Sequence, residues 1–215
     1  MRARVSRKPL FIAIQTGNEG TVKLMLQKSA EIVVNDMGRC CPLSLAFTLG
    51  KITIVKLLLD VGTSASVKSG WFGKEPFSLA SQMENINVVE LLLEAGVNLE
   101  AKYLSGQAAL LLASERGNIN AIKLLLKAGA KFDTKNRFGQ TPLLLASLRN
   151  HINVIKLSLE AGADIEEKDS TNGTALSLAS EKGDTNAIRF LLEAGADIDA
   201  KDQFNETPLS FAAEK

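Results

Sequence analysis

Residues 136–146 read Asn-Arg-Phe-Gly-Gln-Thr-Pro-Leu-Leu-Leu-Ala, and this stretch contains the signals that decide the fold. Thr141 is a favourable helix N-cap, and Pro142 follows at the first helical position, where its missing N–H costs nothing. Gly139 marks a turn just before that cap. The stretch therefore predicts a turn followed by a short helix that ends near Asn150.

Proline recurs with one spacing along the whole chain. The prolines are Pro9, Pro42, Pro76, Pro142 and Pro208, at intervals of 33, 34, 66 and 66 residues. Alanines 109 and 175 stand where the period expects the two missing prolines. A fixed period of this size is typical of a solenoid built from one repeated supersecondary unit. Such an architecture favours surface recognition over catalysis.

A second helix is predicted in every complete repeat, because each one carries an apolar triplet. The middle residue of the triplet is, in chain order, Met25, Leu58, Leu92, Leu125, Ser158 and Leu191. The serine breaks this series at a position that we expect to be buried. We expect the hydroxyl of Ser158 to bond to the carbonyl of Val154, which would make the fifth repeat a weak joint in the stack.

This layout resembles the ankyrin repeat, in which a turn precedes two antiparallel helices and Thr-Pro-Leu-His opens the first helix. The matching stretches are Thr141-Pro142-Leu143…Ala146, Thr207-Pro208-Leu209…Ala212, Cys41-Pro42-Leu43…Ala46 and residues 91–96. The resemblance implies an all-α, ankyrin-like solenoid whose helix-turn-helix repeats are joined by β-hairpin-like turns. We expect one domain over residues 1–215, with repeats near 1–35, 36–69, 70–102, 103–135, 136–168 and 169–201 and a partial repeat at 202–215.

Two features depart from the pattern of that family. The histidine after Thr-Pro-Leu is absent from every repeat, so we expect fewer side-chain hydrogen bonds between neighbouring turns. The sequence also stops at Lys215, after the first helix of the seventh repeat. We therefore expect residues 200–215 to fray or to be covered by another protein chain, including a second copy of this one.

Composition argues against several classes of function. The chain is 46% hydrophobic and 23% charged with a net charge of +1, so no excess charge attracts nucleic acid or an anionic membrane. No apolar run approaches the ~18 residues of a membrane span, and the basic residues 1–8 lack the apolar core of a signal peptide. The two cysteines, Cys40 and Cys41, are adjacent and cannot join distant segments. We expect an intracellular, cytoplasmic protein that binds neither nucleic acid nor membrane.

Catalytic chemistry has few candidate residues in this chain. His151 is the single histidine, and we expect a structural or solvated role for it. Cys40 and Cys41 have no Cys-x-x-Cys partner and no predictable base, which argues against a zinc site and a thiol nucleophile. We therefore predict no catalytic residue, no metal and no cofactor, and we expect that the chain is not an enzyme.

Large apolar residues at the turn tips are the strongest indication of function. In the ankyrin family, turn tips and first helices line a concave groove that usually binds a partner. Exposed apolar groups mark interaction sites, and Trp and Arg dominate binding hot spots. The predicted protein-binding residues are Met37, Leu49, Trp71, Phe72, Met83, Leu104, Arg116, Phe138, Leu148 and Arg149. We expect Trp71 to be the main anchor; the alternative is that the tips pack against one another across adjacent repeats.

The sequence thus predicts a non-enzymatic module that binds another protein in the concave groove. The alternative function is the targeting or regulatory ankyrin segment of a longer multidomain enzyme, channel or effector. Neither hypothesis names the partner, because one fold serves many unrelated partners.

Overall fold

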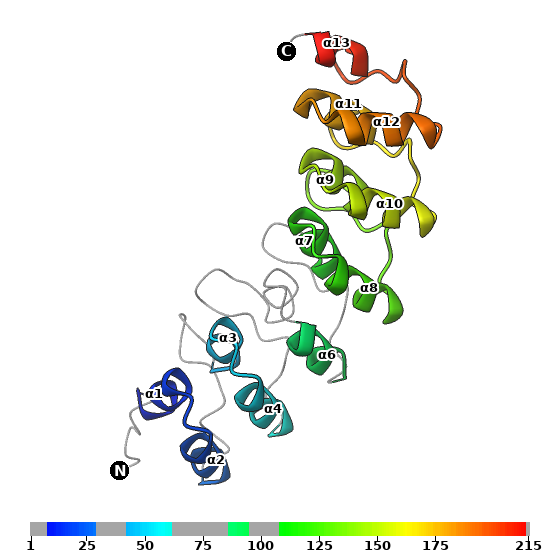
Figure 1. Ribbon diagram of the computed structural model, residues 1–215. Helices are drawn as coiled ribbons and strands as arrows, with labels where there is room; N and C mark the ends of the chain where they lie inside the picture. The colour runs from blue at the N-terminus through cyan, green and yellow to red at the C-terminus, as the bar shows by residue number, and fades with distance from the viewer. Residues whose placement is uncertain (1–7, 29–41, 62–85, 95–107, 214–215) are drawn as a thin grey trace. The chain divides into compact units, whose positions relative to one another are not determined.

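The computed structural model describes residues 8–28, 42–61, 86–94 and 108–213. The chain forms two compact units, residues 1–104 and 105–215, and each is described here by itself. All regular secondary structure in the described ranges is α-helical (Figure 1). This confirms the predicted all-α class.

The first compact unit consists of short helices packed as neighbouring pairs. Its described helices are α1 (Lys8–Thr16), α2 (Glu19–Lys28), α3 (Pro42–Thr48), α4 (Ile52–Asp60) and α6 (Ile86–Glu94). Helix α1 packs against α2 and α3, and α4 packs against α2, α3 and α6. The side chains of Ile14, Phe47 and Leu58 lie in the buried core between them.

The second compact unit repeats the same helix pair. Its helices are α7 (Ala109–Arg116), α8 (Ile119–Lys127), α9 (Pro142–Leu148), α10 (Ile152–Glu160), α11 (Ala175–Lys182), α12 (Thr185–Glu193) and α13 (Pro208–Ala213). The first helices of successive repeats form one row, in which α9 contacts α7 and α11, and α11 contacts α13 (Figure 1). This is the helix-turn-helix stacking that the 33-residue period predicts.

Side chains cap the starts of α9 and α11, whereas α7 begins after Ala108, which has no side-chain cap. In α9, Thr141 Oγ1 accepts a hydrogen bond from the Leu144 N–H at 3.3 Å, and Pro142 is the first helical residue, as predicted. In α11, a serine stands where the ankyrin family has its histidine. Ser177 forms a reciprocal capping box with Thr174, because each backbone N–H donates to the other hydroxyl, at 3.3 and 2.8 Å. The serine thus satisfies helix-start donors that would otherwise be free.

The first helices of the second compact unit are buried along most of their length. Every residue is buried in 109–114 of α7, 142–147 of α9 and 175–180 of α11. Alanine and serine are frequent in these stretches, and their small side chains allow neighbouring first helices to approach closely. The expected groove relied on an exposed side of these helices. In α7, α9 and α11 the surface is formed by the last turns and by the turns that precede these helices, whereas Ile12 in the middle of α1 is 55% exposed.

Ser158 occupies the buried middle position of its triplet, as predicted. Its side chain is 0% exposed, and its Oγ donates a hydrogen bond to the carbonyl of Val154 at 2.8 Å. Leu125 and Leu191, at the same position in the adjacent repeats, are also 0% exposed. Met25 in α2 is only half-buried.

The last described helix, α13, contacts α11. Leu209 in α13 is 68% exposed, whereas Leu143 and Leu176, at the same position of the two preceding repeats, are each 1% exposed. In those repeats a second helix packs against the first, α10 against α9 and α12 against α11. Leu209 is therefore exposed where the rest of the stack buries its leucines.

Candidate protein-binding surface

Three turn tips of the second compact unit lie at the same position of successive repeats. Phe138 is 50% exposed and Phe204 is 71% exposed, and Thr171 between them is also exposed. An exposed phenylalanine in a turn has no role in the core. These tips therefore present apolar side chains to the surroundings at 66-residue spacing.

Each tip is shaped by the residue two positions before it. The side-chain Oδ1 of that residue accepts the backbone N–H of the tip residue, at 2.9 Å for Asn136 and at 2.8 Å for both Asp169 and Asp202. Asn and Asp favour such turns because their short side chains imitate a backbone turn. The two aspartates are therefore occupied by the turn itself and are not an acid/base pair.

Neighbouring tips are joined through their backbones. The Ser170 N–H donates to the carbonyl of Phe138 at 2.9 Å, and the Gln203 N–H donates to the carbonyl of Thr171 at 3.0 Å. At Gly139, whose φ is +72°, an added Cβ would lie 2.9 Å from Ser170 N, so a side chain there would separate the turns. Backbone contacts thus link turns that lack the family histidine.

The aromatic rings remain largely outside these contacts. The guanidinium carbon of Arg137 lies 4.7 Å from the centre of the Phe138 ring, which is a cation–π distance. An exposed aromatic ring next to an arginine is a combination typical of binding hot spots.

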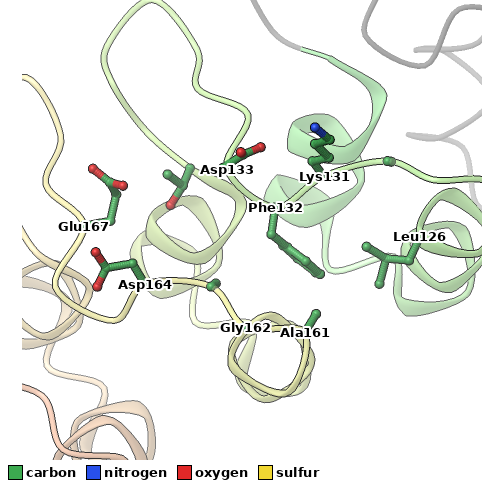
Figure 2. A pocket seen from close by; sticks show the side chains of 11 residues that line it. Leu126, Lys131, Phe132, Asp133, Ala161, Gly162, Asp164 and Glu167 are labelled. Carbon is green, nitrogen blue, oxygen red and sulfur yellow. The ribbon is translucent and has the colours of Figure 1, made fainter.

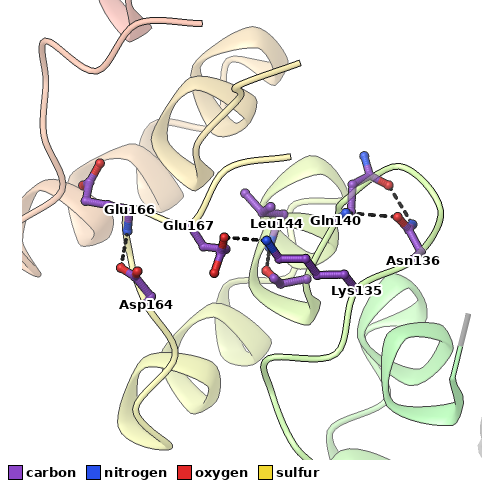
Figure 3. A network of polar contacts seen from close by, with 8 residues as sticks. Lys135, Asn136, Gln140, Leu144, Asp164, Glu166 and Glu167 are labelled. Carbon is purple, nitrogen blue, oxygen red and sulfur yellow. Dashed lines mark hydrogen bonds and ion pairs between the residues drawn. The ribbon is translucent and has the colours of Figure 1, made fainter. Parts of the chain in front are cut away.

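Side chains also link the bases of successive turns. Lys135 Nζ lies 2.6 Å from Glu167 Oε1 (Figure 3), and Lys168 Nζ donates to the carbonyl of Lys201 at 3.2 Å. Exposed ion pairs contribute little to stability, about 0–1 kcal/mol. Their effect here is to hold successive turns in register, which keeps the tips in a row.

A second cluster lies where the first helices end. A hollow of ≈350 Å³ is lined by Glu115, Arg116, Arg149 and His151. Arg149 forms an ion pair with Glu115, with Nη2 and Oε1 2.7 Å apart. Arg116 is exposed, and its guanidinium adds a second positive charge to the hollow. The cluster can therefore offer charged hydrogen-bond donors to an acidic group.

His151 is part of the structure of this cluster. Its Nε2 lies 3.1 Å from the carbonyl oxygen of Glu115, and a carbonyl only accepts, so Nε2–H is the donor. The ring also packs against Gly117, where an added Cβ would lie 2.7 Å from Nδ1. His151 thus joins the fourth and fifth repeats, in agreement with the structural role expected from the sequence.

The structure describes half of the predicted binding residues. Arg116, Leu148 and Arg149 lie together at the ends of α7 and α9, and Leu148 is half-buried there. Phe138 lies in the turn that precedes α9, at the opposite end of that helix from this cluster. Leu49 is 41% exposed after α3 in the first compact unit. Met37, Trp71, Phe72, Met83 and Leu104 lie outside the described residues.

The sequence-based prediction missed two residues of this surface, Glu115 and His151. The sequence does contain a signal for Glu115, because Glu115 and Arg149 have opposite charges and are one repeat plus one residue apart. No signal in the sequence showed that His151 would reach back to the preceding repeat.

The described residues lack two further features. They contain no group of three or more His, Cys, Asp and Glu side chains placed to hold a metal ion. None of their helices has both the length and the hydrophobicity to cross a bilayer.

The arrangement of capped first helices, stacked helix pairs and bonded turn tips defines a repeat solenoid. The family model of ankyrin repeats (3 copies) matches residues 50–136, 77–169, 110–202 and 158–215. These matches together extend over residues 50–215, and the chain belongs to the ankyrin-repeat family.

One similar solved structure is the ankyrin repeat domain of Bcl-3, described as a unique member of the IkappaB protein family. The two sequences are 29% identical, the alignment covers 95% of this chain and 93% of the Bcl-3 chain, and the TM-score is 0.84. Altogether 566 chains of solved structures match, so the fold alone does not select a partner. No curated protein sequence matches the chain.

Proposed function

We propose that this chain is a non-enzymatic module that binds a partner protein through its turn tips and the ends of its first helices. The observation that carries the proposal is the row Phe138–Thr171–Phe204, in which bonded backbones hold two phenylalanines at 50% and 71% exposure. Large exposed apolar groups rimmed by polar ones mark interaction sites. The partner is a protein, and neither nucleic acid nor a membrane is involved.

Membership of the ankyrin-repeat family supports this proposal, because these repeats are generally protein–protein interaction modules. The likeness to the Bcl-3 domain extends over nearly the whole of both chains, which supports a function carried by the repeats themselves. A standard protein interface buries roughly 1,600 Å² in total, an area that several adjacent repeats can supply.

We further propose that both compact units belong to one ankyrin domain located inside the cell. Family matches at residues 50–136 and 77–169 extend across the boundary at residue 104, which supports a single domain. The adjacent cysteines, which cannot form a disulfide framework, support the intracellular location.

The test compares partner binding by wild type and by variants of the tips. A partner captured from lysate is purified and its Kd is measured by calorimetry. We expect the double variant Phe138→Ala/Phe204→Ala to weaken binding by roughly tenfold or more, about 1.4 kcal/mol per tenfold. Trp71→Ala is expected to cost about 2 kcal/mol of binding, as a hot-spot residue does, with little change in melting temperature.

The matched control is Ile198→Ala, because Ile198 is also 50% exposed but lies outside the tips. It should leave the Kd unchanged. Equal binding by wild type and the double tip variant would reject the tips as the binding surface. A large loss of stability in Trp71→Ala would show instead that Trp71 belongs to the core, where removing it costs ~3–5 kcal/mol.

A further inference from the structure

A hollow of ≈450 Å³ lies away from both the tips and the Arg116–Arg149 cluster. It lies between the turn that follows α8 and the turn that follows α10 (Figure 2). Its lining combines apolar residues with three carboxylates and one lysine. Neither the row of tips nor the helix-end cluster includes any of these residues, so the inference below does not rest on the proposed function.

The floor of the hollow is apolar. The ring of Phe132 points between Leu126 and Ala161 (Figure 2), and Phe132 is only 8% exposed. At the same position of the next two repeats, Ile165 is half-buried and Ile198 is 50% exposed. Phe132 is therefore held under the two turns, and an apolar chain segment of a ligand could pack against this floor.

The rim of the hollow is acidic. Asp133, Asp164 and Glu167 line it, and Lys131 extends away from Phe132 (Figure 2). Glu167 is neutralised by Lys135, 2.6 Å away. Lys131 also lines the hollow and adds one positive charge, so Asp133 and Asp164 leave a net single negative charge there. Both carboxylates are exposed, and Asp164 Oδ1 accepts a hydrogen bond from the Glu166 N–H at 2.9 Å.

The C-terminal ends of two helices add to the negative charge at the hollow. Leu126 belongs to the last turn of α8, and Ala161 is the C-cap of α10. The C-terminal end of a helix carries roughly half a negative charge and stabilises cations nearby. The carboxylates and both helix ends thus favour a positive group above an apolar floor.

We propose that this hollow binds an arginine side chain of a partner protein. The aliphatic stem of the arginine lies over Leu126 and Ala161, and the guanidinium reaches Asp133 and Asp164. Arginine matches the site better than lysine because its planar guanidinium can bond to two carboxylates and contact an aromatic edge. A few hundred Å³ is enough for one such side chain and its own backbone.

The test uses N-acetyl-L-argininamide as the probe, with amide chemical shifts of the full chain as the readout. Its uncharged near-isostere, N-acetyl-L-citrullinamide, is the control ligand. We expect saturable shifts at residues 126–133 and 161–167 with the arginine probe, with a Kd of roughly millimolar for so small a ligand. The citrulline probe should bind at least about fivefold more weakly, since it lacks the charge.

Two variants test the site itself. Asp133→Asn/Asp164→Asn should weaken the arginine probe roughly tenfold, and the Asn oxygen can still accept the Glu166 N–H that Asp164 accepts. Ala161→Leu should abolish binding by filling the floor without changing the charge. The matched control Asp199→Asn removes an exposed carboxylate at the same turn position as Asp133, two repeats later. This control should bind like wild type.

Three results would overturn the proposal: no saturable shift with the arginine probe, equal affinity for both probes, or an equal loss in Asp199→Asn. Dispersed spectra and unchanged melting curves confirm that the variants are folded. Ala161→Leu leaves every charge in place. A loss of probe binding in this variant would therefore show that the probe binds in the hollow and is not merely attracted by the surface charge.

Discussion

Gly117 is subject to two independent constraints at the residue scale. Its φ is +72°, in the left-handed region that favours glycine, and an added Cβ would lie 2.7 Å from Nδ1 of His151. Gly129 has a comparable φ of +93° but nothing within 4 Å of an added Cβ. The two glycines therefore form a natural pair for separating backbone strain from contact with the histidine.

We predict that Gly117→Ala destabilises the chain more than Gly129→Ala. In both variants the free energy of unfolding should fall by about 1–2 kcal/mol, because alanine is strained in the left-handed conformation. Gly117→Ala should lose about 1 kcal/mol more, because the His151 ring must move and give up its hydrogen bond to Glu115. Chemical denaturation measures both free energies of unfolding.

A double-mutant cycle supplies the control for this prediction. In a His151→Ala background the extra cost at Gly117 should disappear, since no ring remains to collide with the new methyl group. Equal costs at Gly117 and Gly129 in the wild-type background would contradict the role of His151 as a link between repeats.

At the level of single helices, α10, the second helix of the fifth repeat, has the polar residue Ser158 at the buried middle position of its triplet. We predict that Ser158→Leu raises the melting temperature and sharpens the transition. The burial of a leucine is worth ~1.5–3 kcal/mol, of which part should be recovered. The adjacent repeats accommodate Leu125 and Leu191 at 0% exposure in the same place, which supports room for the side chain.

Ser158→Ala is the control for that substitution. It removes the hydroxyl that bonds to the Val154 carbonyl, a contact that slightly weakens a helix, but it adds no apolar volume. We expect a much smaller change in melting temperature than for leucine. An unchanged or lower melting temperature for Ser158→Leu would show that the surrounding side chains have repacked around serine. The fifth repeat would then not be a weak joint.

At the scale of the whole molecule, each repeat is stabilised mainly by its neighbours. Helix α13 contacts α11, yet Leu209 remains 68% exposed. We predict that amides of residues 208–213 exchange faster than those of α9 and α11 in a monomeric sample, because local opening there exposes little further apolar surface. Hydrogen exchange followed by mass spectrometry measures this difference.

The same experiment at increasing protein concentration examines self-association through α13. Slower exchange of α13 as concentration rises would support coverage by a second copy. Protection of α13 equal to that of α11, in a sample shown to be monomeric by ultracentrifugation, would contradict the prediction that this end frays.

Local features of the second compact unit were predictable from sequence to within a residue or two. Thr141 caps α9, Pro142 opens it, and Asn150 adopts a left-handed φ of 62° after its end. These features depend on the conformational limits of single residues, which each residue type carries with it. The buried serine at 158 was predictable for a related reason, since a repeated position has a repeated environment.

The exposure of the candidate surface was less predictable. The sequence placed Phe138 at a tip, but only the packing of α7, α9 and α11 buries the central part of each first helix and leaves the tips and helix ends as the surface. The period alone does not determine how closely two first helices approach each other, because that distance depends on the volumes of side chains from different repeats.

The repeat, its helices and the caps of α9 and α11 follow from the amino-acid sequence alone, because a 33-residue period and local backbone rules act within one repeat. Only the tertiary structure decided that Arg149 pairs with Glu115, that His151 packs against Gly117, and that an acidic hollow forms around Phe132. Each of these contacts joins residues about one repeat apart in sequence. They exist because stacking brings equivalent positions of neighbouring repeats within contact distance, where the size and charge of both partners decide the result.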